Sequence, residues 1–277
     1  MNLVVPADFT TAARTAAGYA SRIAEKTGAG IVLLHVHTPP VSRNNPVWPL
    51  DAETTGSIRL ETNQRMARYF SDCLKADQVR YEGKTRVGRL TDEIIMEAAE
   101  DSPSMIVMAT SEDCMLHALF RESNTSGVIE STRTPVLVLP EGIHPRTPER
   151  VSFATDCQPS DLGAIELLAS LCASLNAELT VIHVRTDDQG HDHPSVEEFT
   201  WRARERTGFD GISCLSVSAP DVTEGLIDHI SSEPTDLMSF TLRKTSPWNK
   251  IFKRSLAEKI LSRVKLPLLL YPSRKHP

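Results

Sequence analysis

The sequence predicts an α/β fold of two tandem doubly wound domains, each an open, mostly parallel five-stranded sheet with helices on both faces. Three observations lead to this prediction. The segment 105–140 recurs without a gap 132 positions later, as 237–272. Each copy begins and ends with a short apolar run that shows no alternation, the pattern of a strand buried on both faces of a parallel sheet. A strand–helix–strand pattern opens each half of the chain, and such crossovers connect parallel strands.

The elements of the first half follow in order. Leu3–Val5 is a short strand ended by Pro6. Thr10 and Thr11 are candidate N-caps of a helix over residues 12–27, and Gly28 ends that helix. Further strands are expected at 31–36, 78–81, 105–110 and 135–140, and further helices at about 51–75, at 90–100 and shortly before the last strand. This half therefore has the order expected for a five-stranded doubly wound sheet.

The second half repeats this order at an offset of 148, so that Asp8 corresponds to Asp156 and His35 to His183. A strand at 212–217 and a helix at 222–230 continue the match. The offset then falls to 132, which means that the first half carries 16 more residues between about 38 and 86. We expect a first domain over 1–140, a linker over 141–149 that is marked by Gly142, Pro145 and Pro148, and a second domain over 150–277.

Composition excludes several classes of protein. The formal net charge is −6 and the isoelectric point is about 5.9, which argues against general nucleic-acid binding. No apolar run reaches the length of a membrane span, and the start of the chain lacks the basic region of a signal peptide. The five cysteines are scattered singly without a CxxC pair, as expected for reduced thiols. We therefore expect a cytoplasmic protein without a membrane association.

Ligands of doubly wound sheets bind outside the carboxyl ends of the strands. Asp8 and the loop after the fourth strand both follow strand carboxyl ends in the first half. The aspartate after strand one, the segment Leu33-Leu34-His35-Val36 and the final segment Pro135–Pro140, each with a counterpart in the second half, together resemble the universal stress protein family in its tandem form. This resemblance implies a Rossmann-like domain of the adenine-nucleotide-hydrolase-like type in each half.

Members of this family that bind ATP carry Gly-x2-Gly-x9-Gly-Ser after strand four. Glycines let the backbone approach the phosphates, and the serine opens a helix whose N–H groups hold them. The corresponding positions here are Ala109, Glu112, Glu122 and Ser123 in the first half, and Thr241, Lys244, Arg254 and Ser255 in the second. All three glycines are therefore absent from both copies, and no cofactor, ATP included, is expected.

The charges of the two loops differ in sign. The first contains Glu112, Asp113 and Glu122, which would repel a triphosphate. The second contains five basic residues and no acidic one between Thr241 and Ser255. It is a candidate anion site near Lys244 and Arg254, although basic side chains on a loop can equally be solvated or contact an acidic partner.

The remaining candidate residues have structural alternatives. By resemblance Asp8 and Asp156 face the adenine and ribose end of a nucleotide, but an aspartate at such a turn also caps backbone N–H groups. His35 and His183 are expected to be structural, because no nucleophile motif accompanies them. His191-Asp192-His193 would hold no more than an adventitious ion. We expect no catalytic residue and no dedicated metal site.

The sequence thus favours a universal stress protein that is not an enzyme, a stress-response or regulatory module with degenerate nucleotide motifs in both halves. It would act through a protein partner or through self-association, for example as a dimer. Resemblance to the family further suggests that the two domains pair about a pseudo-twofold axis through their last strands. The alternative is a sensor that retains one nucleotide or anion site in domain 2.

Overall fold

The computed structural model describes residues 1–38, 41–42, 45–46, 52–74, 79–100, 104–110, 124–186, 195–242 and 256–272. The chain divides into two compact units. The first contains Met1–Val136 and Glu141–Arg146, and the second contains Leu137–Pro140 and Thr147–Pro277. The end of the first repeat and the expected linker are therefore distributed over both units, and each unit is described below by itself.

The first unit follows the predicted alternation of strands and helices. Its elements are β1 (Asn2–Pro6), α1 (Thr11–Thr27), β2 (Gly30–His37), β3 (Val41–Ser42), β4 (Asn45–Pro46), α2 (Ala52–Phe70), β5 (Tyr81–Val87), α3 (Leu90–Glu100), β6 (Ser104–Ala109) and α5 (Asn124–Ser131), before the chain enters β7 (Val136–Leu139). Strands β6, β1, β2 and β5 lie side by side in that order. All three pairings are parallel, and Leu3 of β1 is aligned with Ile31 on one side and Met105 on the other.

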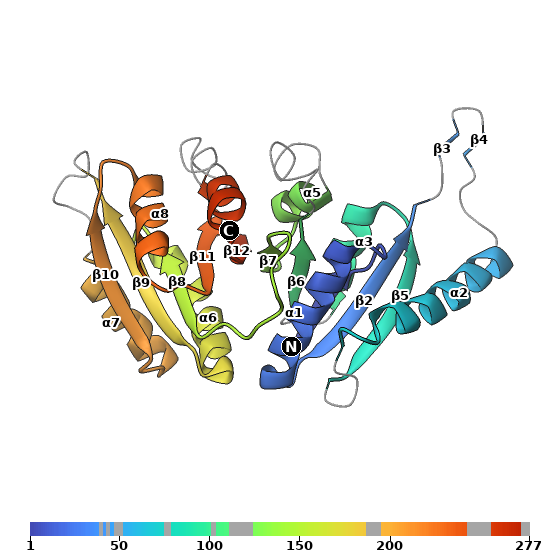
Figure 1. Ribbon diagram of the computed structural model, residues 1–277, viewed down its shortest axis with the longest axis horizontal. Helices are drawn as coiled ribbons and strands as arrows, with labels where there is room; N and C mark the ends of the chain where they lie inside the picture. The colour runs from blue at the N-terminus through green and yellow to red at the C-terminus, as the bar shows by residue number, and fades with distance from the viewer. Residues whose placement is uncertain are drawn as a thin grey trace. The chain divides into compact units, whose positions relative to one another are not determined.

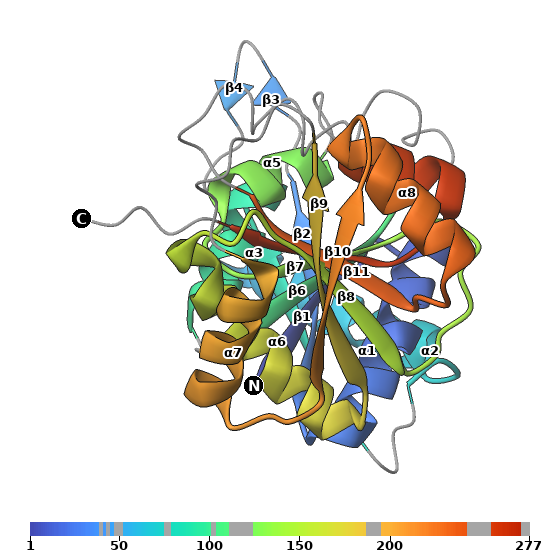
Figure 2. The same ribbon diagram turned by 90° about the vertical axis from the view of Figure 1, so that its left-hand side faces the viewer.

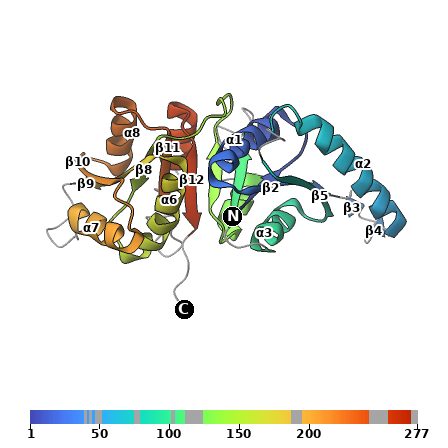
Figure 3. The same ribbon diagram turned by 90° about the horizontal axis from the view of Figure 1, so that it is seen from below.

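Helices cover both faces of this sheet. Figure 3 shows α1 and α2 on one face and α3 on the other. Helix α1 begins at Thr10, whose hydroxyl accepts a hydrogen bond from the N–H of Ala13 at 3.1 Å. It ends at Gly28, whose φ of 70° suits glycine because it has no Cβ. The structure thus selects Thr10 over Thr11 as the N-cap and confirms Gly28 as the stop.

Two predictions about the extent of elements in the first unit are wrong. The third strand was expected at 78–81 but runs over Tyr81–Val87, because its alternating charged residues are paired by α3 and do not form an apolar run. The second helix was expected to continue to about residue 75 but ends at Phe70. There the N–H groups of Cys73 and Leu74 both donate to the Phe70 carbonyl, which closes a turn after the helix.

The extra residues of the first half lie between about 38 and 86, as the fall in the offset between the two repeats predicts. β3 and β4 form a two-stranded antiparallel hairpin within the proline-rich segment (Figure 1). Helix α2 contains 19 residues, whereas the corresponding helix of the second unit, α7 (Val196–Thr207), contains 12. The carboxyl end of the longer helix lies beside the start of α1, where Arg14 bonds to Tyr69.

The second unit repeats the architecture without the hairpin. Its elements are β8 (Arg150–Ala154), the short helix η1 (Pro159–Asp161), α6 (Leu162–Leu175), β9 (Glu178–Arg185), α7, β10 (Ile212–Ser218), α8 (Val222–Ser232), β11 (Leu237–Leu242), η2 (Ile260–Val264) and β12 (Leu268–Pro272). The strand order is β10, β9, β8, β11 and β12, and the neighbours pair in parallel. Figure 2 shows α6 and α7 on one face of this sheet and α8 on the other.

Each unit buries an aliphatic core between its sheet and its helices. In the first unit the central strand β1 is buried at Leu3, Val4 and Val5, and α1 presents a run of buried alanines to it. Small side chains let the helix approach the sheet closely. Among the described residues, none of the helices is both long enough and apolar enough to cross a membrane.

Candidate functional site

The carboxyl end of β1 leads into a tight turn that uses the side chain of Asp8. One carboxylate oxygen of Asp8 accepts hydrogen bonds from the Thr10 backbone N–H at 3.1 Å and from the Thr10 hydroxyl at 2.6 Å. Phe9, between them, has a φ of 63°, in the left-handed region that residues other than glycine rarely adopt. Asp8 therefore holds the entry to α1, and the turn directs Phe9 back over the edge of the sheet.

The Phe9 ring lies in an aromatic cluster at this edge. Its centroid is 5.1 Å from that of His35, 5.6 Å from that of Tyr69 and 6.4 Å from that of Phe70. His35, near the end of β2, has its Nδ1 atom 2.6 Å from the carbonyl oxygen of Ala7. Because a carbonyl oxygen only accepts hydrogen bonds, Nδ1 carries the proton and donates it. His35 thus ties β2 to the turn after β1.

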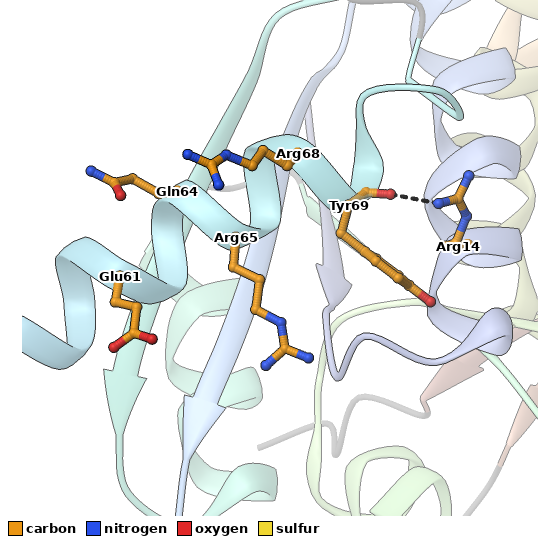
Figure 4. Close-up of a pocket in the computed structure, with 6 residues that line it drawn as sticks. All are labelled: Arg14, Glu61, Gln64, Arg65, Arg68 and Tyr69. Atoms are coloured by element: carbon orange, nitrogen blue, oxygen red, sulfur yellow. Dashed lines mark hydrogen bonds between the residues drawn. The ribbon is translucent and has the colours of Figure 1, made fainter.

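A groove with three arginines lies beside this cluster. It has a volume of about 480 Å³ and is lined by Arg14 of α1 and by five residues of α2, namely Glu61, Gln64, Arg65, Arg68 and Tyr69. Figure 4 shows Arg14 facing Tyr69 across the space between the two helices. The α2 residues follow the spacing i, i+3, i+4, i+7 and i+8, which places them on one face of a helix.

Two of the three arginines are fixed by contacts. Nη1 of Arg14 donates to the backbone carbonyl of Tyr69 at 2.8 Å, and the Arg14 guanidinium lies 5.0 Å from the Tyr69 ring centroid. Nη2 of Arg14 lies 3.7 Å from a carboxylate oxygen of the exposed Asp72. The guanidinium of Arg65 lies over the Phe9 ring at 4.0 Å from its centroid, a cation–π contact. The groove and the aromatic cluster are therefore one connected surface.

Sequence reasoning missed this groove. The helical spacing on α2 was a readable signal, but solvated helix faces show the same spacing. Arg14 joins the set only because α2 crosses the start of α1, and the chain separation of 55 residues hides that contact.

The second unit repeats the backbone of the turn, and its described residues form no aromatic cluster there. Cys157 stands at the position of Phe9 and has a matching φ of 60°. His183 repeats His35, with its Nδ1 donating to the Thr155 carbonyl at 2.9 Å. The Thr155 hydroxyl donates to the buried Asp161 carboxylate at 2.7 Å and accepts from the N–H of Cys157 at 2.9 Å. The same strand edge is therefore closed here by small polar groups.

Cys157 has little nucleophilic character. Burial is the main cause that raises the pKa of its thiol to about 12, and the negative charges of Asp156, Asp161 and Glu197 raise it further. The thiol is therefore protonated at neutral pH, whereas nucleophilic cysteines react as thiolates.

The other residues predicted from the sequence are only partly described. Ala109 ends β6 beside β1, and Thr241 lies near the end of β11 beside β8, so each shares a sheet edge with the aspartate of its own unit, Asp8 or Asp156. Asp8 is exposed and Asp156 is half-buried. The predicted positions Glu112, Glu122, Ser123, Lys244, Arg254 and Ser255, and the cluster 191–193, lie outside the described residues. Within the described residues, no group of three or more His, Cys, Asp or Glu side chains is placed to hold a metal ion.

A separate cluster of charges links β5 to α3 on the other face of the first sheet. The Glu97 side chain is only 2% exposed, and its two carboxylate oxygens accept from Lys84 Nζ at 2.8 Å and from Arg86 Nε at 2.9 Å. Arg86 also pairs with Glu100 and lies 3.8 Å from Glu93. Although burial alone would raise the pKa of Glu97, the hydrogen bonds from Lys84 and Arg86 outweigh it and lower that pKa. Because each charged side chain of this cluster is paired with one of opposite charge, we interpret the cluster as structural.

Comparisons with known proteins agree with this architecture. The profile described as the universal stress protein family matches residues 1–140. Among solved structures, a universal stress protein from Archaeoglobus fulgidus is 17% identical with a TM-score of 0.70, and the match covers 99% of this chain and 97% of that one. The comparison with curated proteins found no match.

Two structures from Pseudomonas aeruginosa are also similar over their length. A functionally unknown protein from strain PAO1 is 16% identical with a TM-score of 0.59, covering 98% of this chain and 92% of that one. A putative universal stress protein from strain UCBPP-PA14 is 15% identical with a TM-score of 0.60, covering 98% and 93%. These structures share the fold over both repeats, and the family profile spans the first repeat. The chain therefore belongs to the universal stress protein family, in its tandem two-domain form.

Proposed function

We propose that this protein is a non-catalytic stress-response or regulatory module of the cytoplasm that works through a protein partner or through self-association. The observation that carries the proposal is the packing of the Phe9 ring against His35 at the carboxyl edge of β1 and β2. In the family this edge is the adenine and ribose end of the nucleotide site. In this chain aromatic side chains and the Asp8 turn lie at that edge, which supports the proposal that no nucleotide binds there.

The state of Asp8 supports the same proposal. Its carboxylate, which would face the ribose of a nucleotide, already accepts two hydrogen bonds from Thr10. Releasing them would remove the bonds that hold Thr10, the N-cap residue of α1, at a cost of about 1 kcal/mol. The loss of all three glycines after strand four adds a second obstacle, since side chains at those positions keep the backbone away from phosphates.

The chemistry of the turn in the second unit also favours a non-catalytic role. The Cys157 thiol has a pKa of about 12 and is therefore a poor nucleophile at neutral pH. The Nδ1 atom of the neighbouring His183 is committed to the Thr155 carbonyl. The protonated thiol is therefore what favours a non-catalytic role, and His183 joins β9 to the turn after β8.

The test combines a thermal-shift titration with an assay for ATP hydrolysis. Two forms of the purified protein are titrated with ATP, AMP and cyclic AMP. One is the parent, and the other is the variant R65Q/R68Q, which lacks two of the three arginines of the groove between α1 and α2. A ligand that binds only the native state at a hundredfold its Kd adds about 2.7 kcal/mol to the unfolding free energy. The proposal expects no shift in R65Q/R68Q and no hydrolysis above the buffer rate. Hydrolysis that the parent shows and that Asp8→Ala or Asp156→Ala removes would refute it.

A sensor with one site in the second domain is the second candidate. It is favoured by the turn of the second unit, where Cys157 replaces Phe9 and the ring that packs against His35 in the first unit has no counterpart at that position. The same titration separates the two candidates. A shift that persists in R65Q/R68Q and disappears on changing Lys244 and Arg254 to alanine would support the sensor.

A further inference from the structure

We propose that the groove between α1 and α2 binds a small polyanion, a free molecule with two linked phosphate groups. The lining contains three arginines and one glutamate, so its formal charge is +2. Guanidinium groups bind phosphate oxygens through paired N–H donors, which makes arginine the side chain best suited to such a ligand. The lining comes from α1 and α2 and includes none of the positions that correspond to the family's phosphate loop.

Contacts within the protein already hold two of the three arginines in place, and this favours the binding of an anion in the groove. Arg14 is held by the Tyr69 carbonyl and lies near the Tyr69 ring, while Arg65 lies over the Phe9 ring. A guanidinium placed over an aromatic ring keeps its N–H edge available to an acceptor. Side chains that are already restrained lose less conformational entropy when a ligand binds. An arginine that serves only solubility needs no such restraint.

Arg68 supplies the remaining charge. Its side chain is exposed, and within the described part of the chain it has no hydrogen bond or ion pair. Figure 4 shows Arg65 and Arg68 emerging on opposite sides of the α2 ridge, with Arg14 facing that ridge from α1. Two linked phosphates offer more charge and more acceptor oxygens than a single phosphate, and they can therefore engage more of the three arginines.

Comparison of the two repeats argues against a generic basic surface. The position that corresponds to Arg14 in the second unit is Leu162, which is buried, and the position of Phe9 is Cys157. The second unit therefore lacks both the arginine on the first helix and the ring on which Arg65 lies. The duplication produced the same backbone turn twice, and among the described residues the arginine–aromatic contacts are found at the first copy.

The dimensions of the groove indicate a small molecule. Its volume of about 480 Å³ lies within the range of small-molecule sites, about 300–1,000 Å³. Glu61 adds one negative charge at the end of the α2 face that lies farthest from Tyr69. A ligand with its charge concentrated at the arginine end avoids this carboxylate, which again favours a compact polyanion.

The experiment is a calorimetric titration of the full chain with inorganic pyrophosphate at about 50 mM salt, with orthophosphate as a second arm, since salt screens such contacts. Three forms are compared, namely the parent, R65Q/R68Q, and the matched control R89Q/R202Q. The control removes the same charge from two exposed arginines that lie outside the groove. Arg14 is left unchanged because its bond to the Tyr69 carbonyl joins the two helices.

We expect saturable binding of pyrophosphate that is at least tenfold weaker in R65Q/R68Q and within twofold of the parent in R89Q/R202Q. Orthophosphate should bind at least tenfold more weakly than pyrophosphate to the parent. Thermal melts of all three forms check that the variants are folded. Absence of saturable binding to the parent would overturn the proposal, and so would equal losses in the two double variants.

Binding that survives in R65Q/R68Q and is lost when Lys244 and Arg254 become alanine would also overturn it, because it would place the site in the second domain. Pyrophosphate carries no base and cannot report on the adenine edge near Phe9. Failure of the groove proposal therefore leaves the proposed non-catalytic role intact, and failure of that role leaves the groove intact.

Discussion

The guanidinium of Arg65 lies over the ring of Phe9, 4.0 Å from the ring centroid, and this contact joins the two distinctive features of the first unit. On one side Phe9 packs against His35 at the edge where the family's nucleotide site is expected. On the other side Arg65 lines the groove between α1 and α2. Phe9 thus packs at the carboxyl edge of the sheet and also holds Arg65 at the groove.

Backbone strain at Phe9 leads to the first prediction. Phe9→Ala and Phe9→Gly both remove the ring, but only glycine adopts a φ of 63° without a steric penalty. We expect Phe9→Gly to be more stable than Phe9→Ala by about 0.5–1 kcal/mol, even though glycine has the more flexible unfolded chain. Urea unfolding measures the difference. Cys157→Gly and Cys157→Ala should show the same order at the equivalent turn, and the opposite order at both turns would contradict the strain argument.

The second prediction concerns the buried carboxylate of Glu97. Glu97→Gln keeps the shape of the side chain but leaves Lys84 and Arg86 without their buried counter-ion. We expect a loss of about 2–3 kcal/mol in the free energy of unfolding, below the largest values for buried pairs because Arg86 retains Glu100 and Glu93. Glu100→Gln is the matched control. Since Glu100 is 48% exposed, its loss should cost no more than about 1 kcal/mol, and equal losses in the two variants would disprove a special role for burial.

The same cluster predicts how stability depends on pH. The pKa of Glu97 is lower in the folded protein than its ordinary value of 4.5. Its stabilising contribution is therefore complete above about pH 4.5 and is lost as the pH falls through the folded pKa. Lys84 and Arg86 have raised pKa values, so their contribution is lost only at strongly alkaline pH.

Urea unfolding at several pH values tests this dependence. The difference in unfolding free energy between the parent and Glu97→Gln should be constant near neutral pH and should shrink below about pH 4.5. A difference that stays constant down to the acid transition would show that Glu97 does not titrate as proposed.

The fourth prediction concerns thiol reactivity. Burial raises the pKa of Cys157 and of Cys172 to about 12, whereas Cys214 is exposed. A rise of three pKa units reduces the thiolate fraction about a thousandfold near neutral pH. In a Cys114→Ser background, iodoacetamide at pH 8 should label Cys214 and leave Cys157 and Cys172 unmodified, as measured by peptide mass spectrometry. All three should label in urea, and rapid labelling of Cys157 in the native protein would contradict the prediction.

Much of the fold could be read from the sequence because its signals are local. The apolar runs of β1, β2 and β6, the cap at Thr10 and the stop at Gly28 each depend on a few neighbouring residues. The duplication then supplied the order of elements in the second half. The extent of strand β5 was not predicted, because Lys84 and Arg86 have the sequence pattern of surface residues. In the folded protein their charges are paired with Glu97 of α3.

The candidate site was less predictable. The sequence singled out Asp8 and His35 correctly as residues at strand carboxyl ends, and it left open whether Asp8 caps the turn or faces a ligand. It gave no indication that Phe9 would fold back against His35, since that depends on a left-handed backbone at a residue that rarely adopts one.

The sequence by itself determined the two repeats and their parallel strands, because burial periodicity and turn chemistry are written in neighbouring residues. Only the tertiary structure decided which side chains share a surface. Arg14 meets the Tyr69 carbonyl from a position 55 residues away, and Phe9 meets Phe70 of α2 from the turn after β1. Such contacts depend on where the end of α2 lies beside the start of α1, and the packing of α2 on β5 contributes to that position.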